Sequence, residues 1–175
     1  MSGHDEGSAT GQWRTPSLGR RMTCFMYEGV LLFGVVWAAG MVYSLVTGQR
    51  HAMTGQTGMQ FVQFVVLGAY FTWFWSRTGQ TLPMQTWNIR VVTATGAPLT
   101  RLRAVCRYLV AWLWFLPALA AAHLAEIRGG LAVSVILLAG VATYALLSLL
   151  HPRRQFLHDA ICGTQLVEWK PPRPR

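Results

Sequence analysis

The sequence predicts an all-α integral membrane protein with four membrane-spanning helices. Four apolar segments of about 18 residues or more are each long enough to cross a hydrocarbon core of roughly 30 Å. Every Lys and Arg residue except Arg50 and Arg128 falls on the same predicted side of these segments. Because loops rich in Lys and Arg stay in the cytoplasm, both termini are predicted to be cytoplasmic. The expected spans are about residues 22–46, 58–75, 104–122 and 130–150.

Composition restricts the chain to one membrane domain, about residues 20–169, with short tails. Its 175 residues are 53% hydrophobic and 12% charged, which leaves little sequence for a soluble domain. Polar residues 1–19 are predicted to form a disordered cytoplasmic tail, and residues 170–175 a basic tail. The Arg-rich composition is typical of a GC-rich bacterial genome. We therefore expect a multi-pass protein of the bacterial inner membrane.

The net charge of +9 indicates that the protein binds negatively charged partners. The arginines that produce it cluster at the ends of the apolar segments, so anionic lipid headgroups are the expected counter-charge. No soluble segment carries a basic stripe with interleaved aromatic residues, so nucleic acid is not an expected partner.

Each span has its own boundary signals. The first follows Arg20 and Arg21, which can reach the cytoplasmic headgroups, and the second ends in an aromatic cluster at residues 70–75 that is typical of the interfacial belt. The third contains Pro117, which predicts a kink, and the fourth ends just before Pro152, a helix stop signal.

The cytoplasmic loop of residues 77–102 has predicted structure of its own. Residues 82–87 are expected to form a short amphipathic helix along the interface. Residues 87–92 alternate apolar and polar side chains, as a strand does, and residues 163–169 show the same alternation. We predict that these two segments pair as a small cytoplasmic β element, since a lone strand would leave its backbone groups without protein partners. The alternative is two irregular loops at the interface.

Glu28 is an acidic residue inside the otherwise apolar first span, seven residues or about 10 Å along the helix from Arg21. A charge at the centre of a membrane helix costs roughly 2.5–3.5 kcal/mol on insertion scales, so Glu28 should face the interior with a basic partner or a bound proton. Arg107, in the first turns of the third span, is the expected partner, and Asp159 completes the cluster. The alternative is a structural ion pair near the interface.

His158 precedes Asp159, a pair that also occurs in hydrolases and metal sites. Such a site would need further His and Asp ligands, and His151 is the only other histidine close in the sequence. Walker, nucleophile-elbow and haem-attachment motifs are absent. We therefore expect no enzyme activity, no metal and no cofactor.

These charged residues are also where the chain resembles the RDD family of small bacterial membrane proteins, named for one arginine and two aspartates. Arg21 matches the arginine that opens the first transmembrane helix, and Asp159 matches the second aspartate, which follows a histidine. Glu28 stands where the first aspartate is usual, which keeps the charge but lengthens the side chain. Arg107 matches an arginine common at the start of the third span.

The resemblance covers about residues 18–168 and includes a central segment from Gly79 to Gly96, with Pro83-Met84 where Gly-Lys is usual. Most members of the family have no known activity, and transport, including ion or proton antiport, is proposed for some. The resemblance therefore implies a transport-related protein.

The expected transport mechanism moves a proton or small ion. Glu28 would be the titratable relay, Arg21 and Arg107 would tune its pKa, and Asp159 would gate the cytoplasmic mouth. The alternative is a non-catalytic structural or accessory subunit, in which the same charges hold the C-terminal segment to the helix entrances. Either function is compatible with a homo-oligomer or a larger membrane complex.

Overall fold

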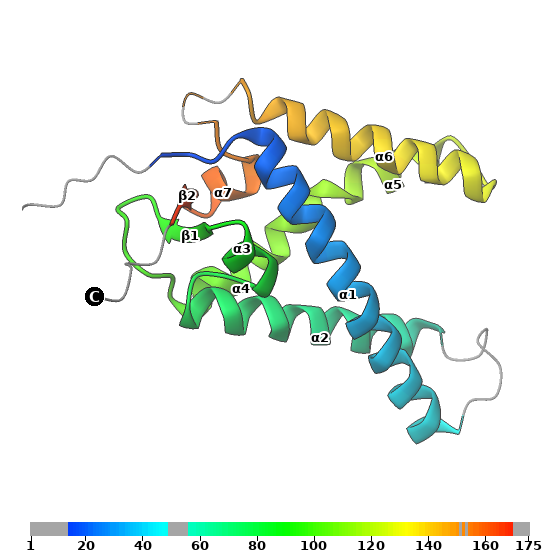
Figure 1. Ribbon diagram of the computed structural model, residues 1–175. Coiled ribbons are helices and arrows are strands. Elements are labelled where there is room, and N and C mark those ends of the chain that lie inside the picture. The colour runs from blue at the N-terminus through cyan, green and yellow to red at the C-terminus, as the bar shows by residue number, and fades with distance from the viewer. Residues whose placement is uncertain (1–13, 49–55, 151, 153, 170–175) are drawn as a thin grey trace, which may run out of the picture.

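A computed structural model describes residues 14–48, 56–150, 152 and 154–169 (Figure 1). The predicted tails at residues 1–13 and 170–175 lie outside the described residues. The described elements, in chain order, are α1 (Leu18–Thr47), α2 (Gln56–Arg77), α3 (Leu82–Thr86), β1 (Ile89–Thr93), α4 (Arg101–Ala111), a 3₁₀ turn η1 (Trp112–Trp114), α5 (Leu116–Leu124), α6 (Gly130–Leu147), α7 (Leu157–Ile161) and β2 (Thr164–Glu168).

Local signals in the sequence set the ends of the longest helix. The Ser17 hydroxyl caps the start of α1 by accepting a hydrogen bond from the Arg20 backbone N–H at 3.3 Å. The helix ends at Gly48, which has a φ of +64° in the left-handed region that glycine adopts without a steric penalty. As a result α1 is 30 residues long and extends a few residues beyond the predicted span.

Three described helical runs are long and apolar enough to cross a membrane: α1, the run Arg101–Leu124, and α6. The chain is therefore mostly helical, as predicted. The expected second span forms α2, a 22-residue helix that is long enough but is not among these apolar runs. The run Arg101–Leu124 is interrupted by η1 just before Pro117, so the predicted break in this span is present.

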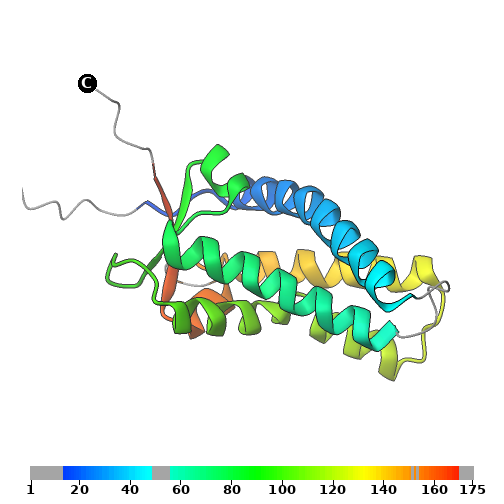
Figure 2. The same ribbon diagram turned by 90° about the horizontal axis from the view of Figure 1, so that it is seen from below.

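The long helices form two arms that extend from one end of the molecule. Helix α1 packs on α2 and helix α5 packs on α6, while α2 also packs on α4. Figure 1 shows the α1–α2 arm diverging from the α5–α6 arm, and Figure 2 shows both arms extending to the same side of the sheet.

The end from which the arms extend is a small platform made of α3, β1, α7 and β2. Strands β1 and β2 pair antiparallel, with Val91 opposite Leu166. The predicted pairing of these segments is confirmed, and the alternative of two irregular loops is wrong. The predicted short helix after residue 81 is also present, as α3.

Residues 14–17 differ from the predicted disordered tail. The Glu168 backbone N–H donates to the Arg14 carbonyl at 2.9 Å, and the Gln155 side-chain amide donates to the Thr15 hydroxyl at 3.0 Å. Because these backbone and side-chain groups find partners on the platform, the segment just before α1 is part of the folded domain.

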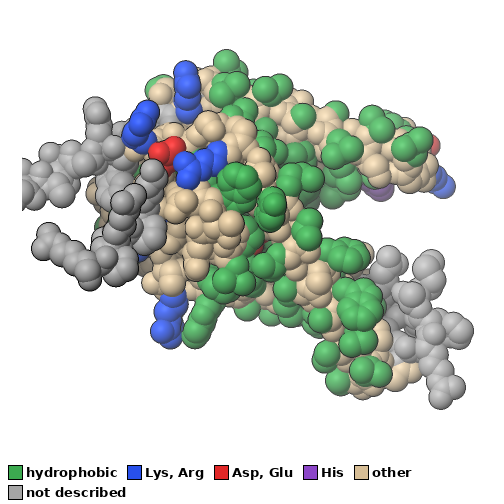
Figure 3. Space-filling model, in the orientation of Figure 1, with side chains coloured by type: hydrophobic (Ala, Val, Ile, Leu, Met, Phe, Trp, Pro, Cys, Tyr) green, Lys and Arg blue, Asp and Glu red, His purple; other side chains and the backbone are tan. Residues whose placement is uncertain are grey.

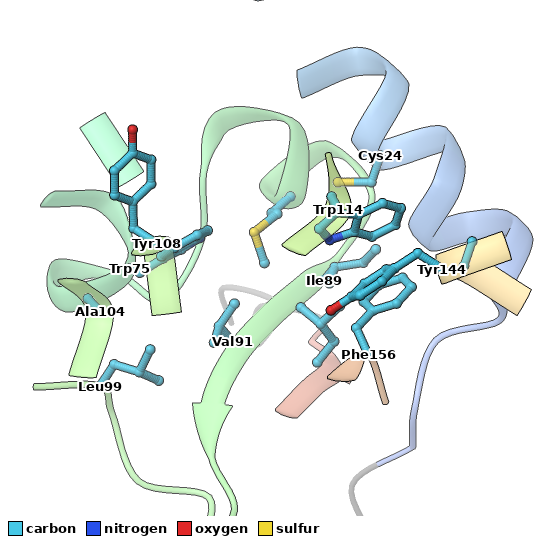
Figure 4. Packing of buried hydrophobic residues seen from close by; sticks show 13 residues of the cluster. Cys24, Trp75, Ile89, Val91, Leu99, Ala104, Tyr108, Trp114, Tyr144 and Phe156 are labelled. Carbon is cyan, nitrogen blue, oxygen red and sulfur yellow. The ribbon is translucent and has the colours of Figure 1, made fainter. Parts of the chain in front are cut away.

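The core lies where the platform meets the arms (Figure 4). The Trp114 ring packs against the Tyr144 ring, with 4.8 Å between centroids, and against the Phe156 ring at 4.9 Å. Along the arms the pattern is reversed: Phe33 is 74% exposed and Leu131 is 82% exposed. In Figure 3 apolar side chains cover both arms, whereas most of the visible Lys and Arg side chains gather near the platform. Apolar exposure on this scale fits a lipid environment.

Candidate functional site

Arg107 and Asp159 form a buried ion pair between α4 and α7. The Arg107 Nη2 and Nε atoms both lie 2.8 Å from Asp159 Oδ1. The Arg107 guanidinium also stacks over the Trp75 ring, 4.1 Å from the centroid. Asp159 is fully buried, so this pair links two segments that lie 52 residues apart in the sequence.

One further hydrogen bond and one histidine ring nitrogen lie close to the Asp159 carboxylate. The Thr164 hydroxyl donates to Asp159 Oδ1 at 2.9 Å, and His158 Nε2 lies 3.6 Å from Oδ2. Burial alone would raise the pKa of the Asp159 carboxyl, but the Arg107 charge, His158 and these hydrogen bonds hold that pKa below its usual value. The carboxylate is therefore ionised at neutral pH.

His158 is a buried neutral histidine. Burial lowers its pKa to about 4, against the opposing effect of Asp159. Its Nδ1 lies 3.0 Å from the Tyr144 hydroxyl, which also accepts a hydrogen bond from the His158 backbone N–H at 2.9 Å. His158 therefore attaches the platform to α6.

Glu28 faces α2 and the start of α3, and the expected ion pair between Glu28 and Arg107 does not form. The Tyr70 hydroxyl donates to Glu28 Oε1 at 2.8 Å, and the Thr81 hydroxyl donates to Oε2. Since Arg107 is occupied by Asp159, the carboxylate of Glu28 has hydroxyl partners in place of a basic one.

Arg21 is as deeply buried as Arg107, at 4% exposed for each residue, but its surroundings differ. Its guanidinium lies over the Phe156 ring, 4.4 Å from the centroid. Within the described part of the chain, its Nε and Nη1 atoms have no hydrogen-bond partner. The neighbouring Arg20 instead points to the platform, where it pairs with Glu168 at 3.1 Å and donates to the Trp87 carbonyl at 2.7 Å.

A cavity of about 350 Å³ lies between α1, α2, α4 and η1. Four of the five predicted site residues contribute to its wall: Arg21, Glu28, Arg107 and His158. Asp159, the fifth, lies behind Arg107 and does not line the cavity. The rest of the wall is almost entirely aromatic and aliphatic, so the charged groups face an apolar space.

The hydroxyl partners of Glu28 were not predicted. Thr81 lies in the Gly-Gln-Thr-Leu segment that contributes to the resemblance, and Tyr70 lies in the aromatic cluster assigned to the interface. Their roles depend on how α1 packs against α2, which residue spacing does not reveal. Within the described ranges, no three His, Cys, Asp or Glu side chains lie close enough together to hold a metal ion.

Comparison with known proteins identifies the family of the chain. The chain matches the RDD family over residues 15–163, which includes every one of the predicted site residues. No curated protein and no solved structure matches the chain.

Proposed function

Because the chain belongs to the RDD family, we propose that it is a multi-pass protein of the bacterial inner membrane with four spans and both termini in the cytoplasm. The contact between Arg14 and Glu168 supports an even number of spans, since it brings the two ends of the domain together on one side. Three apolar runs would place these ends on opposite sides, so α2 is the fourth span. The arginines near the platform assign that side to the cytoplasm.

The function that the site supports best is movement of a proton or small ion. The observation that carries this proposal is Glu28, a carboxylate that lines an apolar cavity and has hydroxyl partners. Such a carboxylate can take up or release a proton without breaking an ion pair. In this mechanism Glu28 exchanges the proton, Arg21 sets the electrostatic field beside it, and the Arg107–Asp159 pair closes the cytoplasmic end.

Flux in proteoliposomes tests this proposal. Wild-type protein should show flux driven by a pH or cation gradient, and Glu28→Gln should abolish it while leaving abundance and thermal stability near wild type. Glu168→Gln is the matched control, because Glu168 is a carboxylate on the platform surface. Wild-type flux no greater than that of empty liposomes would contradict the proposal.

A second candidate is a non-catalytic accessory subunit that acts in a homo-oligomer or a larger membrane complex. The Arg107–Asp159 pair favours it, because that pair attaches the C-terminal segment to α4 as a structural link would. In this case Glu28→Gln should yield an unstable protein that Glu28→Asp partly rescues. Neither function requires enzyme activity or a cofactor, and both place anionic lipid headgroups around the arginines.

A further inference from the structure

The unpartnered guanidinium of Arg21 indicates a missing anion. A buried charge is normally paired, because removal from water is costly when nothing replaces the lost hydration. Arg107 follows this rule, whereas Nε and Nη1 of Arg21 have no hydrogen-bond partner among the described residues. A planar guanidinium with two unpartnered nitrogen atoms is suited to a carboxylate or phosphate.

Glu28, the acidic residue in the cavity wall, does not pair with Arg21. Glu28 lies seven residues further along α1, about 10 Å away along the axis, and both of its carboxylate oxygens accept hydrogen bonds from hydroxyls. Asp159 Oδ1 accepts hydrogen bonds from Arg107 and Thr164. Asp159 Oδ2 has no hydrogen-bond partner among the described residues, and it makes no hydrogen bond to Arg21. An anion that pairs with Arg21 therefore has to come from outside the described part of the chain.

The walls of the cavity indicate that the rest of the ligand is apolar. Phe25 and Leu32 from α1, and Leu67 from α2, make its lining predominantly apolar. Gly29 also lines it, and a Cβ at this position would meet no atom within 4 Å. An inorganic anion would leave these walls without a partner, and an apolar molecule would leave Arg21 without one.

Access to the cavity is from the apolar part of the molecule. Its lining comes from both arms, with Leu32 on α1 and Phe115 at the start of α5. Figure 3 shows the molecular surface hollowed between these arms, with apolar side chains on both. A molecule dissolved in the lipid phase could therefore enter without crossing a charged surface.

We propose that this cavity binds a single-chain lipid with an oxyanion headgroup, a carboxylate or a phosphate. The headgroup pairs with Arg21, and the acyl chain lies against the apolar wall past Gly29. The volume of about 350 Å³ lies near the lower limit of small-molecule pockets, roughly 300–1,000 Å³, which fits one chain. This binding goes beyond the proposed ion movement and does not require Glu28 to exchange a proton.

Quenching of tryptophan fluorescence by brominated lipids tests the proposal, because Trp75, Trp112 and Trp114 line the cavity. Full-length protein in phosphatidylcholine nanodiscs would be titrated with brominated stearate, brominated lysophosphatidate and the methyl ester of brominated stearate. The ester measures quenching from the surrounding bilayer. At least one anionic probe should quench saturably, with a half-saturation concentration about tenfold or more below that of the ester.

Two variants localise the binding. Arg21→Gln should lower the affinity for the anionic probe about tenfold or more. Gly29→Leu should abolish saturable quenching, because the added side chain fills the cavity. Arg101→Gln is the control, because Arg101 is an exposed arginine on α4. Equal quenching by the acid and its ester would overturn the proposal. The proposal also fails if Gly29→Leu, which retains Arg21, binds the probes as wild type does.

Further measurements distinguish the possible sources of the anion, and they distinguish lipid binding from the proposed ion movement. Acetate and inorganic phosphate should not displace the lipid probe at millimolar concentration, and full displacement would overturn the role of the acyl chain. The tighter of the two anionic probes identifies the headgroup. Quenching in wild-type protein is measured without any ion gradient, so lipid binding stands even where the flux experiment fails.

Discussion

Arg107 and Arg21 are two buried arginines in the same protein, and they differ in one respect. Both are 4% exposed, and both guanidinium groups stack on an aromatic ring at 4.1 to 4.4 Å. Arg107 has the carboxylate of Asp159 at 2.8 Å, whereas two nitrogen atoms of Arg21 have no hydrogen-bond partner in the part of the chain described.

This difference predicts unlike effects of substitution at the two arginines. A paired arginine holds segments together, and removing its partner leaves a buried charge uncompensated. An unpaired arginine that lines a cavity contributes little to folding and can bind an anion. The expected effects of substitution on stability should therefore fall into two groups.

The largest loss of stability should follow Asp159→Ala. This change leaves the Arg107 guanidinium buried without its counter-charge, which typically costs about 3–5 kcal/mol. Thermal unfolding in detergent measures it, with Glu168→Gln as the control, because the Arg20–Glu168 pair is partly exposed and should contribute less than about 1 kcal/mol. Equal losses in the two variants would show that the buried pair is not a structural link.

Acid should cause the next largest loss of stability, through the buried His158 beside the Arg107–Asp159 pair. The unfolded chain protonates His158 below about pH 6.5, whereas burial keeps folded His158 neutral until its pKa of about 4. Above pH 6.5 the protonation of His158 therefore does not lower the free energy of unfolding. As the pH decreases towards 4, that free energy falls by at most roughly 3 kcal/mol. The lowered pKa of Asp159 adds a further loss at more acidic pH.

Melting temperatures from pH 8 to 4.5 check the effect of His158. His158→Asn should flatten the profile, and the same change at the exposed His123 should leave it as in wild type. A wild-type profile that stays flat over this range would contradict a buried neutral histidine.

Thr164→Val should have a smaller effect on the same network. The variant removes the 2.9 Å hydrogen bond to Asp159 Oδ1 but leaves the contacts from Arg107 in place. We expect a loss of about 1–2 kcal/mol in unfolding free energy. Thr86→Val, at an exposed position on α3, is the control and should have little effect.

The smallest change in stability should follow Arg21→Gln. Loss of the stacking on Phe156 is opposed by removal of an unpaired buried charge, so we expect a change below about 1 kcal/mol. Arg107→Gln, at equal burial, should be much more damaging. If Arg21→Gln destabilises the protein as strongly as Asp159→Ala, the distinction between the two arginines fails.

Much of the architecture follows from the sequence alone. Runs of apolar residues predict the long helices, because a helix that crosses a membrane faces lipid or other helices along its whole length. Alternation at residues 87–92 and 163–169 predicts the β1–β2 pair, since period-two patterns suit a strand. Charged residues near or within the apolar segments stand out in the sequence because such charges are rare, and the structure places three of them, Arg21, Glu28 and Arg107, around one cavity.

The partners of those charged residues were decided only by the tertiary structure. The sequence placed Glu28 with Arg107, but the packing of α1 on α2 turns Glu28 towards Tyr70 and Thr81. Which side chains meet depends on the rotation and separation of helices distant in sequence, whereas spacing along one helix reports only neighbours on that helix. For the same reason, only the folded structure leaves Arg21 facing a cavity with two of its nitrogen atoms unpartnered among the described residues.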